Sequence, residues 1–283
     1  IVRNLVGTDG SGAAALPNTN DGIVVQAGSR YNHIGDGTFN GRNTISGHPT
    51  YDVLISASDS NTITRNFILL DSAGSVKLSS GIVGISVANA SYNLIGQAGA
   101  GNVLAGQGYG IALSGGGHNM VRNNTMGLAA NGITPVTGGA TGFYLNSGAK
   151  SDSLIDNKVA YGLSTGIYIQ SADSTIMFRN LVHHNSGPGI QIDPGAQLNV
   201  TPPKITSIAF DSTLNGTAAP FALVQIYADS VNQGQIFLDT TKANGSGLWA
   251  KKITLLPGFK LTALQDSAQN TSAFSTPFVP VIA

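Results

Sequence analysis

The chain has 283 residues, 41% of them hydrophobic, and its 14 basic side chains balance its 14 acidic ones. This balance excludes the strongly basic footprint of proteins that bind nucleic acids or anionic membranes. Cysteine is absent, which excludes disulfides, thiolate metal sites and cysteine nucleophiles. No apolar run approaches the roughly 20 residues of a membrane-spanning helix. The 37 glycines, with many Asn, Ser and Thr residues, predict strands and turns rather than helices.

The first 200 residues repeat themselves. An Arg-Asn pair recurs at Arg3, Arg65, Arg122 and Arg179, at intervals of 62, 57 and 57 residues. Between these pairs, runs with alternating apolar residues lie 23 to 32 residues apart. The runs centre on Ile23, Val53, Ile85, Ile111, Phe143, Ile167 and Ile190. This spacing suits one coil of a three-faced solenoid, so we predict an all-β, right-handed parallel β-helix of about seven to eight coils over residues 1–200.

Three Gly-rich segments interrupt the coils. They are Gly7–Asp21, Leu70–Ser80 and Ala129–Ala140. We expect them to project as loops from one corner of the solenoid, with any groove lying beside them.

Asparagine recurs in each coil. One series follows the strand centres by 8 or 9 residues, and a second series comes later in the coil. The members are Asn32, Asn61, Asn93 and Asn119, then Asn43, Asn66, Asn102, Asn124, Asn157 and Asn180. Coils stack about 4.8 Å apart, so corner asparagines can hydrogen-bond to one another as a ladder. Because Asn also tolerates the left-handed backbone of a corner, we predict a structural role for both series.

The composition changes at residues 199–203, where Pro202 and Pro203 end the repeats. Beyond them, short alternating runs are separated by turn signals such as Pro257-Gly258. Seven short strands in about 80 residues predict an immunoglobulin-like β-sandwich over residues 201–283, with Trp249 in its core.

Two patterns resemble known proteins. Gly-Thr-Asp-x-x-Gly-x-Ala-Ala over Gly7–Ala15, with recurring Asn-x-Ile and Ile-Gly, resembles large bacterial right-handed β-helix repeat proteins. The segment from Val224 through Trp249 to Ser275 looks like the immunoglobulin-like module that often follows such repeats. The resemblance implies a secreted, extracellular or cell-surface bacterial protein. That superfamily includes adhesins, filament and surface proteins, lyases, hydrolases and epimerases, so the fold does not settle the function.

Paired carboxylates and arginines are the first candidates for chemistry. Hydrolases on this fold use close Asp pairs, but Asp152 and Asp156 would lie about 13 Å apart along a strand, so we predict corner and surface roles for them.

Lyases on this fold combine Ca²⁺ with Lys or Arg. Arg65, Arg122 and Arg179 could form a stripe that binds an acidic polysaccharide. We favour the alternative, in which each arginine packs its stem and caps corner carbonyls.

The densest titratable cluster is His183 and His184 with Arg179, followed by Asp193 one strand later. A His beside an Asp could act as a general base. Adjacent residues on a strand point to opposite faces, so the two His should not bind one metal ion. We therefore predict no metal and no cofactor; Ca²⁺ binding stays open, with no motif in the sequence to support it. If the protein is an enzyme, the catalytic candidates are Arg179, His184 and Asp193.

The chain enters inside a repeat at Ile1, with no amphipathic cap before it. The open end of a β-helix exposes unpaired backbone N–H and C=O groups and apolar core side chains. We therefore expect this end to be covered by a longer chain or by a second copy stacked head to tail. Three hypotheses follow. The first is a non-catalytic structural protein, an adhesin segment or filament subunit. The second is a polysaccharide lyase or hydrolase, and the third is a carbohydrate-binding protein without turnover.

Overall fold

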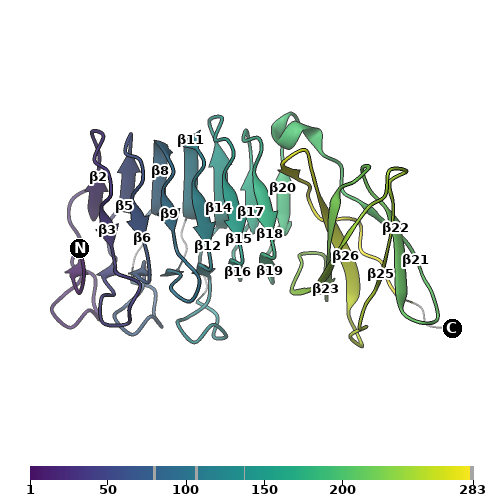
Figure 1. The fold of residues 1–283 in the computed structure, drawn as a ribbon. Coiled ribbons are helices and arrows are strands. Elements are labelled where there is room, and N and C mark those ends of the chain that lie inside the picture. Colours follow the sequence, from purple (N-terminus) through teal and green to yellow (C-terminus); the bar gives the residue numbers. More distant parts are fainter. Residues whose placement is uncertain (79–80, 106–107, 137, 281–283) are drawn as a thin grey trace.

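The structure is a computed structural model that describes residues 1–78, 81–105, 108–136 and 138–280. Its larger part is a right-handed parallel β-helix in which each coil contributes strands to three sheets (Figure 1). Sheet 1 consists of β2 (Ile23–Val25), β5 (Tyr51–Ser56), β8 (Val83–Ser91), β11 (Tyr109–Gly117), β14 (Thr141–Asn146), β17 (Ile167–Ile169) and β20 (Ile190–Ile192).

The other two sheets complete each coil. Sheet 2 consists of β3 (His33–Ile34), β6 (Thr62–Ile63), β9 (Leu94–Ile95), β12 (Met120–Arg122), β15 (Ser153–Ile155) and β18 (Ile176–Phe178). Sheet 3 consists of β1 (Leu5–Val6), β4 (Thr44–Ile45), β7 (Phe67–Ile68), β10 (Val103–Leu104), β13 (Thr125–Met126), β16 (Lys158–Ala160) and β19 (Leu181–His183). The predicted all-β solenoid is confirmed.

Parallel pairing stacks like residues along the solenoid axis. The predicted strand centres pair directly with one another, and all of them are buried. Each full burial of such a side chain contributes about 1.5–3 kcal/mol, so the repeated apolar column is the main source of stability of the solenoid.

The two asparagine series form ladders at two corners. Asn124, for example, donates from its backbone N (3.0 Å) and its Nδ2 (3.1 Å) to Oδ1 of Asn157 in the next coil. One ladder, between sheets 2 and 3, contains Asn4, Asn43, Asn66, Asn102, Asn124, Asn157 and Asn180. The other, between sheets 1 and 2, contains Asn32, Asn61, Asn93, Asn119 and Asp152.

The backbone role that we predicted for these asparagines is wrong. The left-handed residue is the one before the ladder residue, as at Arg65 (φ 57°), Tyr92 (φ 59°) and Asp156 (φ 56°). The ladder asparagines are therefore selected for their side-chain amide, which satisfies buried corner groups, and not for their backbone conformation.

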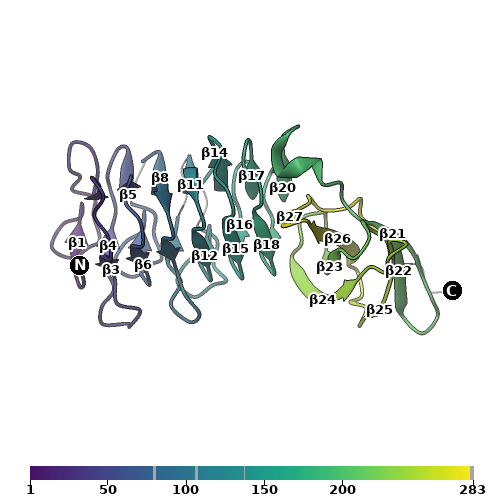
Figure 2. The ribbon, with the colours of Figure 1, turned by 45° about the horizontal axis from the view of Figure 1, so that its top comes forward.

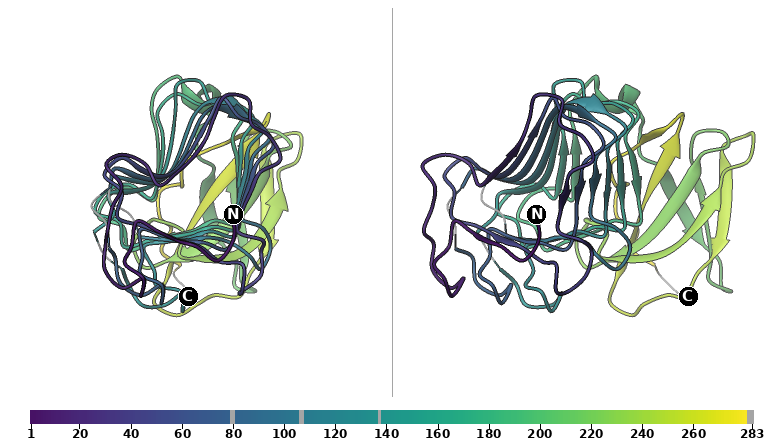
Figure 3. Two further views of the ribbon diagram at one scale, coloured as in Figure 1. Left: turned by 90° about the vertical axis from the view of Figure 1, so that its left-hand side faces the viewer. Right: turned by 60° about the vertical axis from the view of Figure 1, so that its left-hand side comes forward.

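The Gly-rich segments project from the corner between sheets 3 and 1, as predicted; residues 79, 80 and 137 within them lie outside the described part. Each segment contains a short antiparallel bridge, Thr8 with Ala15, Leu70 with Lys77, and Leu128 with Pro135. The loops also stack on one another, because the backbone N of Ser72 donates to Gly12 O (2.9 Å) and that of Ala130 to Gly74 O (2.8 Å). Figure 3, viewed along the solenoid in its left panel, shows loops of successive coils projecting together.

The C-terminal module contains two antiparallel sheets that share a core. One sheet has β21 (Lys204–Ile208), β22 (Thr213–Thr217) and β25 (Leu248–Lys252); the other has β24 (Ile236–Lys242), β23 (Leu223–Asp229), β26 (Lys260–Ser267) and β27 (Asn270–Thr271). A short 3₁₀ turn, η1 (Ala196–Asn199), precedes the module. Leu214, Val224 and Trp249 pack together between the two sheets, and Trp249 is 4% exposed. The core role predicted for Trp249 is confirmed, whereas the domain boundary and the immunoglobulin-like topology stay predictions.

The module lies against the last coil of the solenoid (Figures 1 and 2). On β23, alternate residues face the module core, while Gln225 and Tyr227 face the solenoid. Gln225 donates to Met177 O (2.7 Å) and accepts from Arg179 N (2.9 Å), and Gln233 accepts from Asn185 N (2.8 Å).

Apolar side chains of the module also enter the solenoid core. Tyr227, Leu264 and Phe274 belong to the same buried cluster as the strand centres of the coils. The module thus takes the place of a further coil. The edge of the last coil is covered within the chain, so a second copy cannot pair its first coil there in this arrangement.

Candidate functional site

The sequence candidates Arg179, His184 and Asp193 lie at three different corners of the last coil. Arg179 lies between β18 and β19, His184 lies between β19 and β20, and Asp193 follows β20. The residues also have separate partners: Arg179 pairs with Asp156, His184 with His183, and Asp193 with Tyr168. The structure therefore does not bring the three together.

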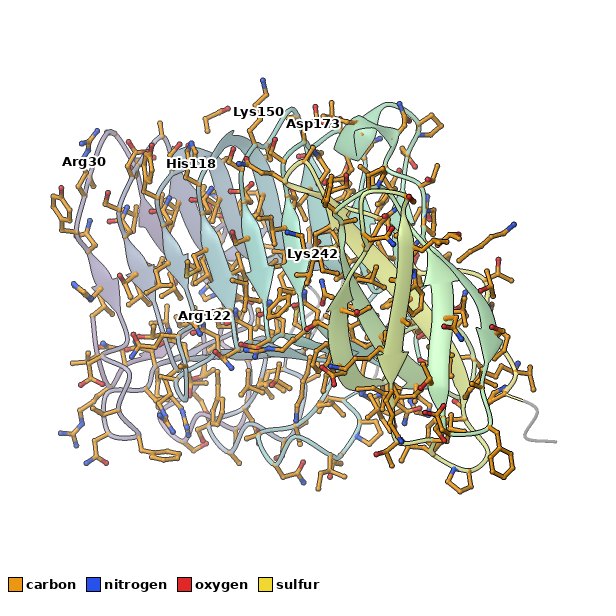
Figure 4. The ribbon with its side chains drawn as sticks, turned by 45° about the vertical axis from the view of Figure 1, so that its right-hand side comes forward. Arg30, His118, Arg122, Lys150, Asp173 and Lys242 are labelled. Atoms are coloured by element: carbon orange, nitrogen blue, oxygen red, sulfur yellow. The ribbon has the colours of Figure 1, made fainter. Side chains whose placement is uncertain are left out.

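The arginine stripe is interrupted. Arg122 is in β12 and pairs with Ile155, while Asn123 occupies the corner position equivalent to Arg65 and Arg179. Figure 4 shows Arg122 away from the edge of the solenoid that carries Arg30. The spacing of the Arg-Asn pairs was misleading because the ladder residue of this coil is the second asparagine of the Asn123-Asn124 pair.

The remaining arginines already have partners. Arg65 Nη1 donates to Gly37 O (3.0 Å) and Gly99 O (2.8 Å), and its guanidinium lies 3.7 Å from the centre of the Phe39 ring. Arg179 makes a two-pronged pair with Asp156, at 2.7 and 2.8 Å, which raises the pKa of the arginine. Arg65 thus caps carbonyls and packs on a ring, as in the favoured interpretation, whereas Arg179 pairs with a carboxylate. Binding of an acidic polymer stays a prediction.

The two carboxylates differ in environment. Asp156 is half-buried beside Arg179, at a corner, as expected. Asp152 is also at a corner, but it is fully buried as the last member of a ladder and not a surface group as predicted. Burial raises its pKa to about 6.

The histidines do not point to opposite faces, which corrects the prediction. His184 leaves the strand in a left-handed conformation (φ 55°), and its Nδ1 lies 2.8 Å from His183 Nδ1. The ring of Tyr161 stacks on His184 with centroids 5.0 Å apart and an interplanar angle of 19°. Burial, followed by the neighbouring His184, lowers the pKa of His183 to about 4. The His183 ring is therefore neutral at physiological pH.

Pockets are not confined to the loops as expected, because one of about 460 Å³ lies on the C-terminal module, lined by residues such as Pro203 and Phe278. A small pocket lies beside the ring of Tyr161, at the corner that carries the loops. Its volume is about 20 Å³, which leaves space for one or two waters. Met126, Gly139, Thr141 and Tyr161 are among the lining residues.

A row of tyrosines on sheet 1 was missed by the sequence analysis. Tyr109 stacks on Tyr144, with centroids 4.4 Å apart and an angle of 13°, and Tyr144 lies 5.4 Å from Tyr168. Tyr144 and Tyr168 alternate with the buried strand centres, so both face outward. The sequence feature that could have revealed the row is an apolar-Tyr-apolar pattern, shared by Phe143–Leu145 and Ile167–Ile169, which pair in register.

Polar side chains continue this row and fix it. The hydroxyl of Tyr144 donates to Gln170 Oε1, and that of Tyr168 donates to Asp193 Oδ2 (2.7 Å). The hydrogen bond to Asp193 raises the pKa of Tyr168 to about 12. Gln191, which pairs with Tyr168 in the sheet, donates to Asp193 Oδ1 (3.3 Å). We call these residues the tyrosine row: Tyr109, Tyr144, Tyr168, Gln170, Gln191 and Asp193.

Comparison with known families decides the class of protein. The family described as "right handed beta helix region" matches residues 73–226, more than half of the chain. The chain belongs to this family. A search of curated proteins found no match.

Three solved structures are similar to the chain. The enzymatically active domain of tailspike protein 2 of bacteriophage CBA120 has a TM-score of 0.28 and 9% identity, over 96% of this chain and 73% of that one. Full-length tailspike protein 2, from a phage of Escherichia coli O157:H7, has a TM-score of 0.27 and 9% identity, over 96% and 65%. Tailspike protein gp49 of Acinetobacter baumannii phage Fri1, a capsular polysaccharide depolymerase, has a TM-score of 0.20 and 10% identity, over 92% and 57%. At these scores the likeness transfers no function.

Two searches of the described residues found nothing. No group of three or more His, Asp, Glu or Cys side chains is arranged to hold a metal ion within residues 1–78, 81–105, 108–136 and 138–280. Over the same ranges, no helix has the length and apolar character to cross a membrane.

Proposed function

We propose that this β-helix binds an extracellular polysaccharide along sheet 1, through the tyrosine row. The observation that carries the proposal is the stack of Tyr109, Tyr144 and Tyr168, whose last two hydroxyls are hydrogen-bonded to polar neighbours. The proposal is one of binding and assigns no catalytic residue.

Sugar chemistry fits such a surface. A sugar ring has an apolar C–H face and a rim of hydroxyls, and tyrosine offers both a ring and a hydroxyl. Tyrosine also supplies rigid contact area at a low cost in conformational entropy. Because Tyr144 and Tyr168 are already held by their neighbours and by each other, little side-chain freedom is lost on binding.

The direction of the row suits a polymer. Its members come from four successive coils, β11 to β20, and coils repeat about every 4.8 Å along the axis. An extended glycan lying along the axis would therefore meet a new contact at each coil. The only charged side chain of the row is the carboxylate of Asp193, which favours neutral glycans over acidic ones.

Affinity electrophoresis tests the proposal, with soluble β-glucan, α-mannan and galactomannan as probes. We expect at least one polymer to retard the protein, and we expect Tyr144→Ala and Tyr168→Ala to weaken binding about tenfold or more, or about 1.4 kcal/mol. Tyr144→Phe, which keeps the ring, should retain most of the binding. Tyr31→Ala is the matched control, since Tyr31 is 73% exposed at another corner. Equal binding by the Tyr144→Ala variant and the wild type would contradict the proposal.

The other hypotheses remain predictions. An adhesin segment could use the same row. The covered last coil argues against a head-to-tail filament that stacks through that end, and the filament stays a prediction. A lyase or hydrolase would release unsaturated or reducing sugars, and His184→Ala would abolish the release.

A further inference from the structure

We infer that His183 and His184 form a two-nitrogen binding site for Cu²⁺ or Ni²⁺. The site lies at the corner between sheets 3 and 1 of the last coil, away from the outward-facing tyrosine row. It is independent of the proposed polysaccharide binding.

The backbone creates the site. His183 ends β19 in extended conformation, and the left-handed turn at His184 reverses the direction of the next side chain. The two Nδ1 atoms consequently approach to 2.8 Å, with the ring planes at 86° to each other. An ordinary strand would have placed the two rings on opposite faces.

The separation fits ions that take neighbouring ligands at right angles. With metal–nitrogen bonds of about 2.0 Å, two nitrogens 2.8 Å apart subtend an angle of about 90° at the ion. This is the angle between neighbouring ligands in square-planar and octahedral complexes, which Cu²⁺ and Ni²⁺ adopt. Imidazole is a good ligand for Cu²⁺, Ni²⁺ and Zn²⁺ alike. Tetrahedral Zn²⁺, however, would need the two nitrogens about 3.3 Å apart.

Protonation does not oppose binding. In the metal-free pair, one Nδ1–H donates to the other Nδ1. The donor ring binds a metal after its proton moves from Nδ1 to Nε2, so its Nδ1 becomes free to bind and no proton is released.

The surroundings leave positions for further ligands. His184 is exposed, so water can complete the coordination shell, and Tyr161 stacks on its ring and limits its rotation. Two charged groups act on His183 from neighbouring elements: Asp229, which favours a cation, and Lys158, which disfavours it. With two protein ligands, the site binds more weakly than a site with three or four.

Electron paramagnetic resonance of the full chain with CuCl₂ tests the inference. We expect hyperfine coupling to two imidazole nitrogens in the wild type, and at least tenfold weaker Cu²⁺ binding by calorimetry in His183→Gln and His184→Gln. His118→Gln is the control. The ring of His118 stacks on Tyr92 with a centroid distance of 5.0 Å, the same as between His184 and Tyr161, but His118 is not followed or preceded by a second His. Its Cu²⁺ affinity should equal that of the wild type.

Circular dichroism of each variant separates loss of the site from loss of the fold. Folded His183→Gln and His184→Gln variants with unchanged Cu²⁺ affinity would overturn the inference. A spectrum with no imidazole coupling in the wild type would do the same.

Discussion

Replacing Asp152 by Asn should stabilise the protein at neutral pH. Asp152 is the one carboxylate in a ladder of asparagines, and it is fully buried. Its Oδ1 accepts from the N (2.8 Å) and Nδ2 (3.0 Å) of Asn119, while its buried Oδ2 has no hydrogen-bond partner. An amide keeps the acceptor and removes the buried charge.

The pKa of Asp152 gives the magnitude and the sign. Burial raises it from 3.8 to about 6, although the hydrogen bonds from Asn119 oppose the shift. Below pH 3.8, the folded and unfolded chains are both protonated and the carboxyl costs nothing. Between pH 3.8 and 6 only the folded chain keeps the proton, so stability falls as pH rises. Above pH 6 the full cost applies, about 3 kcal/mol.

Urea unfolding of the wild type and Asp152→Asn between pH 4 and pH 8 checks this. We expect the stability difference to be small at pH 4 and to rise to about 2–3 kcal/mol in favour of the variant at pH 7.5. Since Asp52 and Asp266 also have a raised pKa, only the difference between the two proteins isolates Asp152. A difference that does not change with pH would refute the reasoning.

Two further substitutions test the packing of the solenoid. Gln233→Ala removes the hydrogen-bond partners of the buried backbone N and O of Asn185. We expect the free energy of unfolding to fall by about 2–4 kcal/mol and amide exchange at Asn185 to become faster. The control Gln97→Ala, on the surface, should change the free energy of unfolding by less than about 0.5 kcal/mol. Asn124→Ala breaks hydrogen bonds to both neighbouring coils and should lower the free energy of unfolding in urea by about 2–4 kcal/mol. A decrease below about 1 kcal/mol would contradict a stabilising role of the ladder hydrogen bonds. Trp249 fluorescence reports separately on the module in both experiments.

The solenoid could be predicted because its signals are local and repeated. Alternating apolar residues recur in every coil, and the parallel register places each strand centre, such as Ile85, on the equivalent residue, Ile111. Asparagine spacing likewise indicated the ladders. Seven occurrences of one pattern outweigh the ambiguity of any single short strand.

The site could not be predicted to the same extent, because it depends on single backbone conformations and on register. The left-handed turn at His184 reversed the side-chain direction expected from strand geometry. One extra asparagine moved Arg122 out of the corner column. Tyr144 and Tyr168 could have been aligned from the predicted strand centres, but the stack of Tyr109 on Tyr144 could not, because Tyr109 is in register with Thr141.

The C-terminal module was expected as a separate sandwich, and its role in covering the last coil was not foreseen. The polar contacts are made above all by Gln225 and Gln233, which lie 40 or more positions from their partners, and apolar side chains such as Phe274 add to them. No local pattern marks a glutamine as the hydrogen-bond partner of the backbone of the last coil. The apolar alternation of β23 hid the fact that both of its faces are buried.

Isothermal titration calorimetry tests glycan binding by sheet 1 most directly. The ligand is a neutral polysaccharide that retards the protein in affinity electrophoresis, and it is titrated into the wild type, the double variant Tyr144→Ala/Tyr168→Ala and the Tyr31→Ala control. Saturable binding that the control retains and the double variant loses by a hundredfold or more is the predicted result. Binding of equal strength by all three proteins would place the glycan elsewhere on the molecule and contradict the account.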